Sequence, residues 1–187
     1  MKSRKLPKLF WLLILVSNYS VLGQNSDYKI LPVGSVDLTK YAGVWYEIAK
    51  IANRFQNQCA RNTTATYELR EDGRIDVVNR CTKNDGSNDG SIDEARGVAK
   101  VVEAKSNAQL KVSFVKIFGI SLFWGDYWIV GLNENYRYAV VGSPSRKYGW
   151  ILSREPQMSD ETLAEVFGIL RDQGYDPEKF EMTEQNH

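Results

Sequence analysis

The chain of 187 residues carries 24 basic and 23 acidic side chains, is 43% hydrophobic, and contains a single histidine, His187. This length suits one domain with a sizeable core. Because the only histidine is the last residue, the composition argues against a Ser-His-Asp or Cys-His nucleophile and against a His-ligated haem or zinc. We therefore expect no catalytic residue, no metal site and no cofactor.

Residues 1–23 have the pattern of a secretory signal peptide. Four basic residues precede an apolar run at 9–16, which is shorter than the roughly 20 apolar residues that a bilayer-spanning helix needs. We predict cleavage after Gly23 and a mature domain of residues 24–187, with a retained anchor helix as the alternative. Removing four of the 24 basic residues leaves 20 against 23 acidic ones, a net charge of −3. Without a basic tract, such a chain is not expected to bind nucleic acid.

Cys59 and Cys81 are the only two cysteines of the chain. Because secretion brings them into an oxidising compartment, we favour a disulfide between them, with two free thiols or a metal pair as alternatives. A bridge closes a loop of about 22 residues, to which the chain-entropy model assigns about 3 kcal/mol.

A hairpin is predicted at residues 63–81. A run rich in Thr, Tyr and Leu leads to the turn Glu71-Asp72-Gly73, and residues 74–81 read as the return strand. Mirror pairing about Asp72 places Cys81 opposite Thr63 rather than Cys59. We therefore expect a bulge or bend near the disulfide.

More strands follow, and then the hydrophobic period changes. The strands are predicted at 92–104, 110–114, 127–132, 136–141 and 148–153, which makes eight with the two strands of the hairpin and the run that begins at residue 44. Ser159 is the expected N-cap of a helix that carries an apolar stripe and ends at Gly174. A last short strand is predicted at 179–183.

This order of elements predicts an all-β fold, an eight-stranded antiparallel up-and-down β-barrel with a C-terminal α-helix packed outside. Closing the sheet removes its exposed edges and leaves an interior about wide enough for one small ligand. An immunoglobulin-like sandwich is the alternative, but it has about 100 residues and does not explain the helix.

Three motifs stand in a characteristic order along the chain. They are Gly43-x-Trp45 with the following Tyr46-Glu47-Ile48-Ala49, then Asp126-Tyr127, then Trp150-Ile151-Leu152-Ser153-Arg154 before the helix. Over residues 34–184 this order and spacing resemble the lipocalin family, in particular the branch of bacterial (Blc-like) lipocalins, apolipoprotein D and plant temperature-induced lipocalins. The resemblance implies a secreted barrel that carries small apolar ligands.

The resemblance also implies structural roles for the motif residues. Trp45 is expected to lie across the closed end of the barrel with the guanidinium of Arg154 stacked on it, a contact of about 0.5–2 kcal/mol. Gly43 belongs to the same structural signature, and Asp126 and Tyr127 are expected to fix a turn at the closed end. The chain departs from the family in having Gly at position 125, where Thr is usual, and in lacking the lipid-anchored N-terminal Cys of bacterial relatives.

Alternation along the strands selects the side chains that face the cavity. For the strand at 127–132 the phase is ambiguous, because both sets of alternating side chains are bulky, and we favour Trp128 and Val130 as the inner set. A solid core without a cavity is the alternative. The predicted ligand-binding residues are Tyr67, Val77, Asn79, Val112, Phe114, Trp128, Val130 and Trp150.

The predicted function is binding and transport of a small hydrophobic ligand, most simply a fatty acid or lysophospholipid, in envelope lipid storage or transport. The alternatives are a lipocalin-type isomerase or de-epoxidase and a tetrapyrrole or steroid carrier. We expect a protein that is not an enzyme, soluble in the periplasm or secreted. Association with the outer membrane, transient contact of the apolar loop at 118–124 with a membrane surface, and a homodimer are left open.

Overall fold

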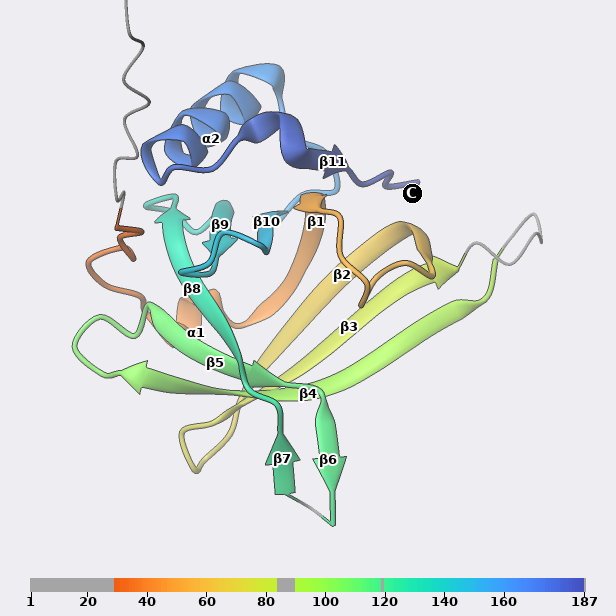
Figure 1. Cartoon of the computed structure of the whole chain (residues 1–187), viewed down its shortest axis with the longest axis vertical. Coiled ribbons are helices and arrows are strands. Elements are labelled where there is room, and N and C mark those ends of the chain that lie inside the picture. The colour runs from red at the N-terminus through yellow and green to blue at the C-terminus, as the bar shows by residue number, and fades with distance from the viewer. Residues whose placement is uncertain (1–28, 84–89, 119, 187) are drawn as a thin grey trace, which may run out of the picture.

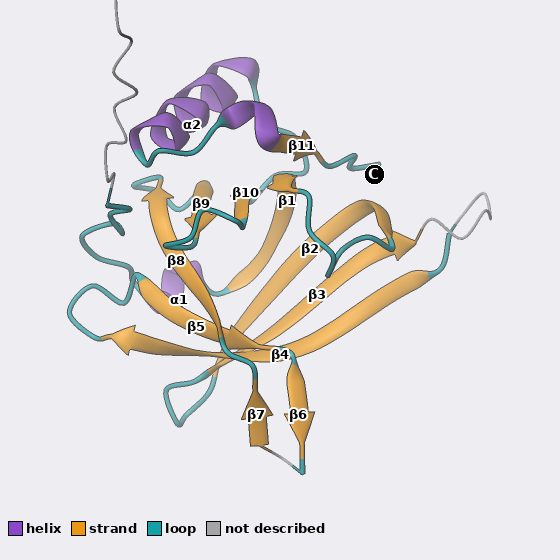
Figure 2. Cartoon of the chain, viewed as in Figure 1, coloured by secondary structure: helices purple, strands orange, loops and turns teal. Residues whose placement is uncertain are grey.

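The computed structural model describes residues 29–83, 90–118 and 120–186 and is built mainly of β-strands (Figures 1 and 2). The predicted signal peptide lies outside the described residues. In chain order the elements are α1 (Leu38–Tyr41), β1 (Gly43–Ile51), β2 (Cys59–Leu69), β3 (Ile75–Lys83), β4 (Ile92–Glu103), β5 (Gln109–Ser113), β6 (Val115–Ile117), β7 (Ile120–Leu122), β8 (Gly125–Leu132), β9 (Tyr138–Gly142), β10 (Gly149–Ser153), α2 (Asp160–Asp172), a 3₁₀ turn (Pro177–Lys179) and β11 (Phe180–Met182).

The main sheet closes on itself. Its nine strands have the order β10-β9-β8-β5-β4-β3-β2-β1-β11, and β10 also pairs with β1, so eight strands form a closed antiparallel barrel. Neighbours in this barrel are neighbours in the chain once the small β6–β7 hairpin is set aside. The predicted eight-stranded up-and-down barrel is therefore confirmed, and closure leaves the short β11 at the edge of the main sheet.

The barrel has two different ends. At the closed end lie α1, the start of β1, the end of β10 and the turns at 70–74, 103–107 and 133–137. At the open end lie the β1–β2 connection at 52–58, the β9–β10 connection at 143–148 and the β6–β7 hairpin, which projects from the barrel (Figure 1). The barrel is therefore plugged at one end and bordered by loops at the other.

The helix α2 covers one outer side of the barrel (Figure 2). Ser159 caps it by accepting from the backbone N–H of Thr162, and Gly174 follows it with φ of 73°, as the capping residues predict. Val166 and Leu170 of the helix are fully buried against the outer faces of β1, β8, β9 and β10. The protein thus has an inner core within the barrel and an outer core beneath the helix.

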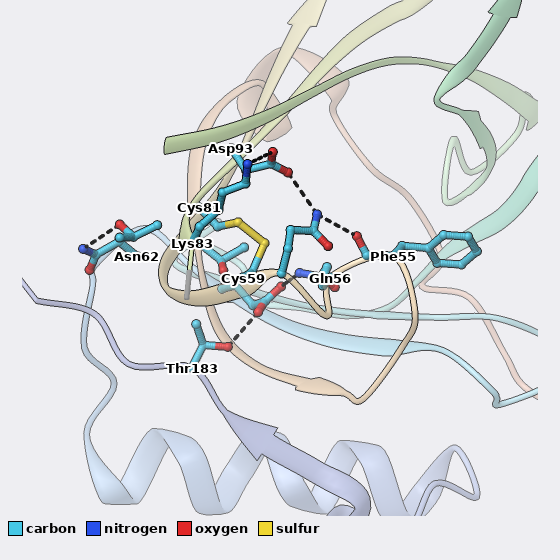
Figure 3. Close-up of a disulfide and its surroundings, with 12 residues drawn as sticks. Phe55, Gln56, Cys59, Asn62, Cys81, Lys83, Asp93 and Thr183 are labelled. Atoms are coloured by element: carbon cyan, nitrogen blue, oxygen red, sulfur yellow. Dashed lines mark hydrogen bonds and ion pairs between the residues drawn. A yellow bond between two sulfur atoms is a disulfide. The ribbon is translucent and has the colours of Figure 1, made fainter. Parts of the chain in front are cut away.

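The disulfide joins Cys59 to Cys81 near the open end, as predicted, with the two Cα atoms 5.5 Å apart (Figure 3). The expected bulge is present, because the β2–β3 register shifts twice between Cys59 and Thr64. Asn62, at this irregularity, has φ of 55°. The chain therefore bends here to bring the two sulfur atoms together.

The C-terminal segment completes the barrel wall where β1 and β2 separate. Their pairing runs only from Gly43 to Tyr46 on β1, and β11 pairs with the remainder of β1. Beyond β11, the side-chain amide of Gln185 donates to the carbonyl oxygens of Glu47 and Thr63, at 2.8 and 2.9 Å. The segment thus supplies hydrogen bonds that the diverging strands cannot make with each other.

Candidate functional site

The inner face of the barrel is mostly apolar and aromatic, because alternate residues of each strand point into it. Four predicted ligand-binding residues lie in this inner cluster, namely Tyr67, Val77, Val112 and Trp150. Although the barrel encloses them, several inner-face side chains keep part of their surface accessible, among them Val101, Val112, Tyr127 and Trp150. These side chains form the partly accessible part of the inner face.

Two further predicted residues also face the interior, the polar Asn79 and Phe114 near the open end. Asn79 pairs with Ala65 of the inner cluster, so both side chains share the inner face. Its Oδ1 atom is buried and has no hydrogen-bond partner within the described part of the chain. Phe114 is 40% exposed and its ring lies against Gly97, which is opposite Val77 in the sheet.

The floor of the barrel is formed by Trp45, which is fully buried. The guanidinium carbon of Arg154 lies 3.8 Å from the centroid of the Trp45 rings, the arrangement that the resemblance implies. Arg154 also donates to four backbone carbonyl oxygens, those of Lys40, Tyr41, Ala42 and Val44, at 2.7–3.2 Å. One side chain thereby joins α1 and the start of β1 to the end of β10.

Gly43 is needed at the floor for two reasons. Its φ of 94° is one that residues with a Cβ rarely adopt, and a Cβ at this position would lie 3.3 Å from a guanidinium nitrogen of Arg154. The motif Gly43-x-Trp45 therefore serves the packing of the closed end and does not contact the accessible interior.

Three tyrosine hydroxyls meet above this floor. The hydroxyl oxygen of Tyr127 lies 2.7 Å from that of Tyr41 and 2.8 Å from that of Tyr67. Burial raises the pKa of Tyr67 to about 12 and raises the pKa values of Tyr41 and Tyr127 well above 10. All three therefore carry their protons at neutral pH and present a neutral, hydrogen-bonding surface in an apolar interior.

A second polar group lies toward the open end. Gln56 of the β1–β2 connection accepts from Trp150 Nε1 at 3.0 Å and donates to a carboxylate oxygen of Glu47 at 2.6 Å. Lys50, opposite Trp150 in the β1–β10 pairing, places its ammonium 3.3 Å from Glu47. Thr183 of the C-terminal segment donates to the same carboxylate at 2.7 Å (Figure 3). Glu47 thus links the mouth, the barrel wall and the C-terminal segment.

The prediction that Trp128 and Val130 line the cavity is wrong. Both belong to the outer cluster, packed with α2, while Tyr127 and Ile129 face inward. A register shift between Ile129 and Gly131 then places Val130 and Gly131 on the outer side together. Because α2 buries the outer face of β8, both faces of this strand are apolar and alternation does not distinguish them.

The prediction that Asp126 and Tyr127 fix a turn at the closed end is also wrong. They lie within β8 rather than in a turn, opposite Lys111 and Leu110 of β5, and Asp126 accepts from the ammonium of Lys111 at 2.8 Å across the strand pair. The turn that joins β8 to β9 at the closed end is at 133–137, where the hydroxyl of Tyr136 accepts from the backbone N–H of Asp37 at 2.8 Å.

The sequence predictions missed Val101 of the apolar wall and three polar residues of the site. Tyr41 belongs to the hydroxyl group at the floor, and Lys50 and Gln56 to the polar group at the mouth. The four-residue spacing of Tyr41 and Trp45 could have indicated the role of Tyr41. The short connection from α1 to β1 brings the two side chains together, with ring centroids 5.0 Å apart. Gln56 lies in a connection without periodicity, so no pattern could place it.

Comparison with known proteins agrees with this geometry. A family model described as a lipocalin-like domain matches residues 36–185. The chain belongs to the lipocalin family. It is 39% identical over 153 residues to the outer membrane lipoprotein Blc of Escherichia coli, covering 82% of this chain and 81% of that protein.

Eukaryotic lipocalins are similar over the same region. Temperature-induced lipocalin-1 of Arabidopsis thaliana is 38% identical, covering 82% of each chain, and mouse apolipoprotein D is 34% identical, covering 80% of this chain and 77% of its own. The solved structure of insecticyanin from the tobacco hornworm Manduca sexta superposes with a TM-score of 0.67 at 23% identity, covering 84% of this chain and 85% of that one. The latter likeness shows the shared fold.

Within the described ranges, no group of three or more His, Cys, Asp or Glu side chains is placed to hold a metal ion. None of the described helices is long and apolar enough to cross a membrane. What the described site offers is an apolar enclosure with one polar group at its floor and another at its mouth.

Proposed function

We propose that this lipocalin binds a fatty acid or a lysophospholipid inside the barrel and transports it, without catalysing a reaction. The observation that carries this proposal is the partly accessible apolar wall inside a closed barrel, formed by side chains such as Val101, Val112 and Trp150. A ligand site of this kind combines apolar walls with a few polar groups that orient the ligand.

The polar group at the mouth supports an anionic head. Lys50 has only 13% of its side chain exposed, and its ammonium stands beside Glu47 and opposite Trp150. A carboxylate or phosphate at the open end can accept from this ammonium while the acyl chain follows the apolar wall toward the floor. Burying about 300 Å² of such a chain yields roughly 7 kcal/mol before the cost of association, which is consistent with micromolar affinity.

The proposal includes a place outside the cytoplasm, in the periplasm or secreted, in storage or transport of envelope lipids. The predicted signal peptide and the disulfide between Cys59 and Cys81 support it. The similar Blc proteins are outer membrane lipoproteins by name, so association with the outer membrane is part of the same proposal.

The enzymatic alternative depends on a reactive group in the cavity. A lipocalin isomerase of the thiol-dependent kind needs an unpaired cysteine, and both cysteines of this chain are joined in the disulfide. Carriage of a tetrapyrrole or steroid is the other alternative, and it is an outcome of the binding test below.

The test is a titration of the purified mature protein with hexadecanoate and with lysophosphatidylcholine, followed by tryptophan fluorescence. We expect saturable quenching with micromolar dissociation constants, and a loss of most of the signal in Trp150→Phe but not in the control Trp128→Phe, which alters the outer core. Native mass spectrometry of protein purified from its own source identifies any ligand carried over. Failure of every acyl probe to bind, or a tetrapyrrole or steroid in the spectrum, would contradict the proposal.

A second proposal concerns the β6–β7 hairpin, which we propose contacts a membrane surface during ligand exchange. Phe118 is 100% exposed, Phe123 81% and Ile120 65%, and the hairpin projects beyond the open end (Figure 1). Monomeric proteins rarely leave apolar side chains so concentrated without a partner. A homodimer formed through the hairpin is the competing explanation.

Vesicle sedimentation and gel filtration separate the two explanations. Membrane contact predicts that the wild type binds phosphatidylcholine vesicles and that Phe118→Ser/Phe123→Ser does not. Both the wild type and this variant should elute from gel filtration as monomers. A wild-type dimer that the same substitutions dissociate, with no vesicle binding, would favour the homodimer.

A further inference from the structure

We infer that the floor of the barrel is a subsite for a hydroxyl group at the buried end of the ligand, so that the preferred lipids are hydroxylated at the chain end remote from the head. The inference rests on the proposed function, since it concerns which acyl ligand the same cavity selects. Its basis is a count of hydrogen-bond donors and acceptors at Tyr41, Tyr67, Tyr127 and Asn79.

The tyrosine group has one donor more than it can use. Each of the three hydroxyls supplies a single proton, and the group contains only two oxygen-to-oxygen contacts, both made by Tyr127. Two protons satisfy these contacts, whichever way they point. The third O–H has no acceptor within the described part of the chain, and it must find one or remain unpaired in an apolar interior.

The unused donor can face the ligand. Tyr41 is 3% exposed and lies deepest, packed on Trp45, whereas Tyr127 is only partly buried and stands on the inner face of β8. Rotating the hydroxyls moves the unused proton from one tyrosine to the next, so the donor can sit on Tyr127 or Tyr67, which stand on the inner faces of β8 and β2. Burial keeps the pKa of Tyr67 at about 12, so the donor persists at physiological pH.

An unused acceptor lies on the same inner face. Asn79 is two residues nearer the open end than Val77, which is itself opposite Tyr67, so it belongs to the next cross-strand pair on the inner face. Its Oδ1 atom is buried without a partner within the described ranges. A hydroxyl is the small neutral group that both accepts from a tyrosine O–H and donates to an amide oxygen. A methyl end satisfies neither atom.

The consequence is a specificity opposite to that of a plain apolar pocket. In such a pocket a terminal hydroxyl loses its hydrogen bonds to water on burial, and binding weakens by about tenfold or more. Here the hydroxyl replaces those bonds with two that the protein otherwise leaves unmade. The hydroxylated chain should therefore bind at least as tightly as the unsubstituted one.

The experiment compares dodecanoate and hexadecanoate with their ω-hydroxylated counterparts by isothermal titration calorimetry. At about pH 8 the carboxylates are ionised and stay at the mouth, so the chain end enters the floor. For the wild-type protein, we expect at least one ω-hydroxylated acid to have a dissociation constant equal to or lower than that of the unsubstituted acid of the same length.

The variant must remove the hydroxyls of both Tyr67 and Tyr127, because either of them alone can carry the unused proton on the inner face. We choose Tyr67→Phe/Tyr127→Phe, in which only the deepest hydroxyl remains. In this variant, the dissociation constant of the ω-hydroxylated acid should be higher than that of the unsubstituted acid by about tenfold or more. The matched control is Tyr138→Phe, whose hydroxyl donates to Glu165 at 2.7 Å in the outer core and should leave the wild-type ratio unchanged.

Each outcome decides between the proposals. A wild-type protein that binds both unsubstituted acids but binds both hydroxylated acids tenfold more weakly overturns this inference and leaves the proposed function standing. An unchanged ratio in a double variant that still binds the unsubstituted acid overturns it as well. If the double variant does not fold, the wild-type ratios alone decide. A wild-type protein that binds none of the four acids overturns the proposed function together with the inference.

Discussion

Replacing Arg154 tests how the closed end is held together. In Arg154→Ala, the protein loses the contact with Trp45, for which cation–π pairs give about 0.5–2 kcal/mol, and the donors to four backbone carbonyl oxygens. Hydrogen bonds from a charged group are worth about 1.5–3 kcal/mol each when buried, but the bonds to Lys40 and Val44 are exposed and those to Tyr41 and Ala42 are only partly buried, so water can replace much of what is lost. We therefore expect the free energy of unfolding to fall by about 3 kcal/mol.

Arg154→Lys tests whether the positive charge is sufficient or the planar guanidinium group is required. An ammonium keeps the positive charge but cannot stack flat on the indole or donate in several directions from a rigid plane. We expect a loss of about 2 kcal/mol, between wild type and Arg154→Ala. Urea denaturation followed by far-ultraviolet circular dichroism measures both, at a temperature where the wild type unfolds reversibly.

Ligand binding provides the decisive control for this prediction. Because Arg154 is outside the accessible interior, folded Arg154→Ala should bind hexadecanoate with the wild-type dissociation constant. A loss of stability below about 0.5 kcal/mol would refute the assignment of the floor to Arg154. So would a fully folded variant that no longer binds the ligand, since the residue would then shape the cavity itself.

Three further predictions concern other parts of the molecule. Cys59→Ser/Cys81→Ser should lower the free energy of unfolding by about 3 kcal/mol, measured by urea denaturation, because the bridge closes a loop with a sequence separation of 22; a midpoint unchanged from wild type would contradict it. Trp128→Ala should lower the melting temperature and spare ligand affinity, whereas Trp150→Ala should weaken binding; the reverse pattern would restore the original choice of inner face. Tyr67 has a folded-state pKa raised to about 12, so it contributes stability that is complete below about pH 10 and is lost as the pH rises toward 12; Tyr67→Phe should flatten the alkaline decline of the melting temperature, and an unchanged slope would contradict that cause.

Much of the barrel followed from local patterns. The turn Glu71-Asp72-Gly73 between two alternating runs predicted the β2–β3 hairpin, and its mirror register predicted that a bulge must precede the disulfide. Ser159 and Gly174 bounded α2 because a side-chain acceptor and a residue free to adopt positive φ are needed at those ends. Each of these features depends on residues close together in the chain.

The inner face of β8 could not be obtained in this way. Its two sets of side chains are equally apolar, one because it faces the cavity and the other because α2, about 30 residues later in the chain, lies over it. Bulges at Ile48 in β1 and near Gly131 in β8 also shift the alternation within single strands. Such shifts arise from pairing with neighbours and leave no signal in the strand itself.

By itself, the sequence determined the family, the order of the eight strands, the helix boundaries and the cysteine pair, because these depend on motif order, turn chemistry and short-range periodicity. The tertiary structure alone decided which polar groups meet inside. Tyr41, Tyr67 and Tyr127 come from three separate elements, and Lys50, Gln56 and Trp150 from another three. They converge because closing the sheet wraps strands distant in the chain around one small interior, where every unpaired donor or acceptor has a consequence for binding.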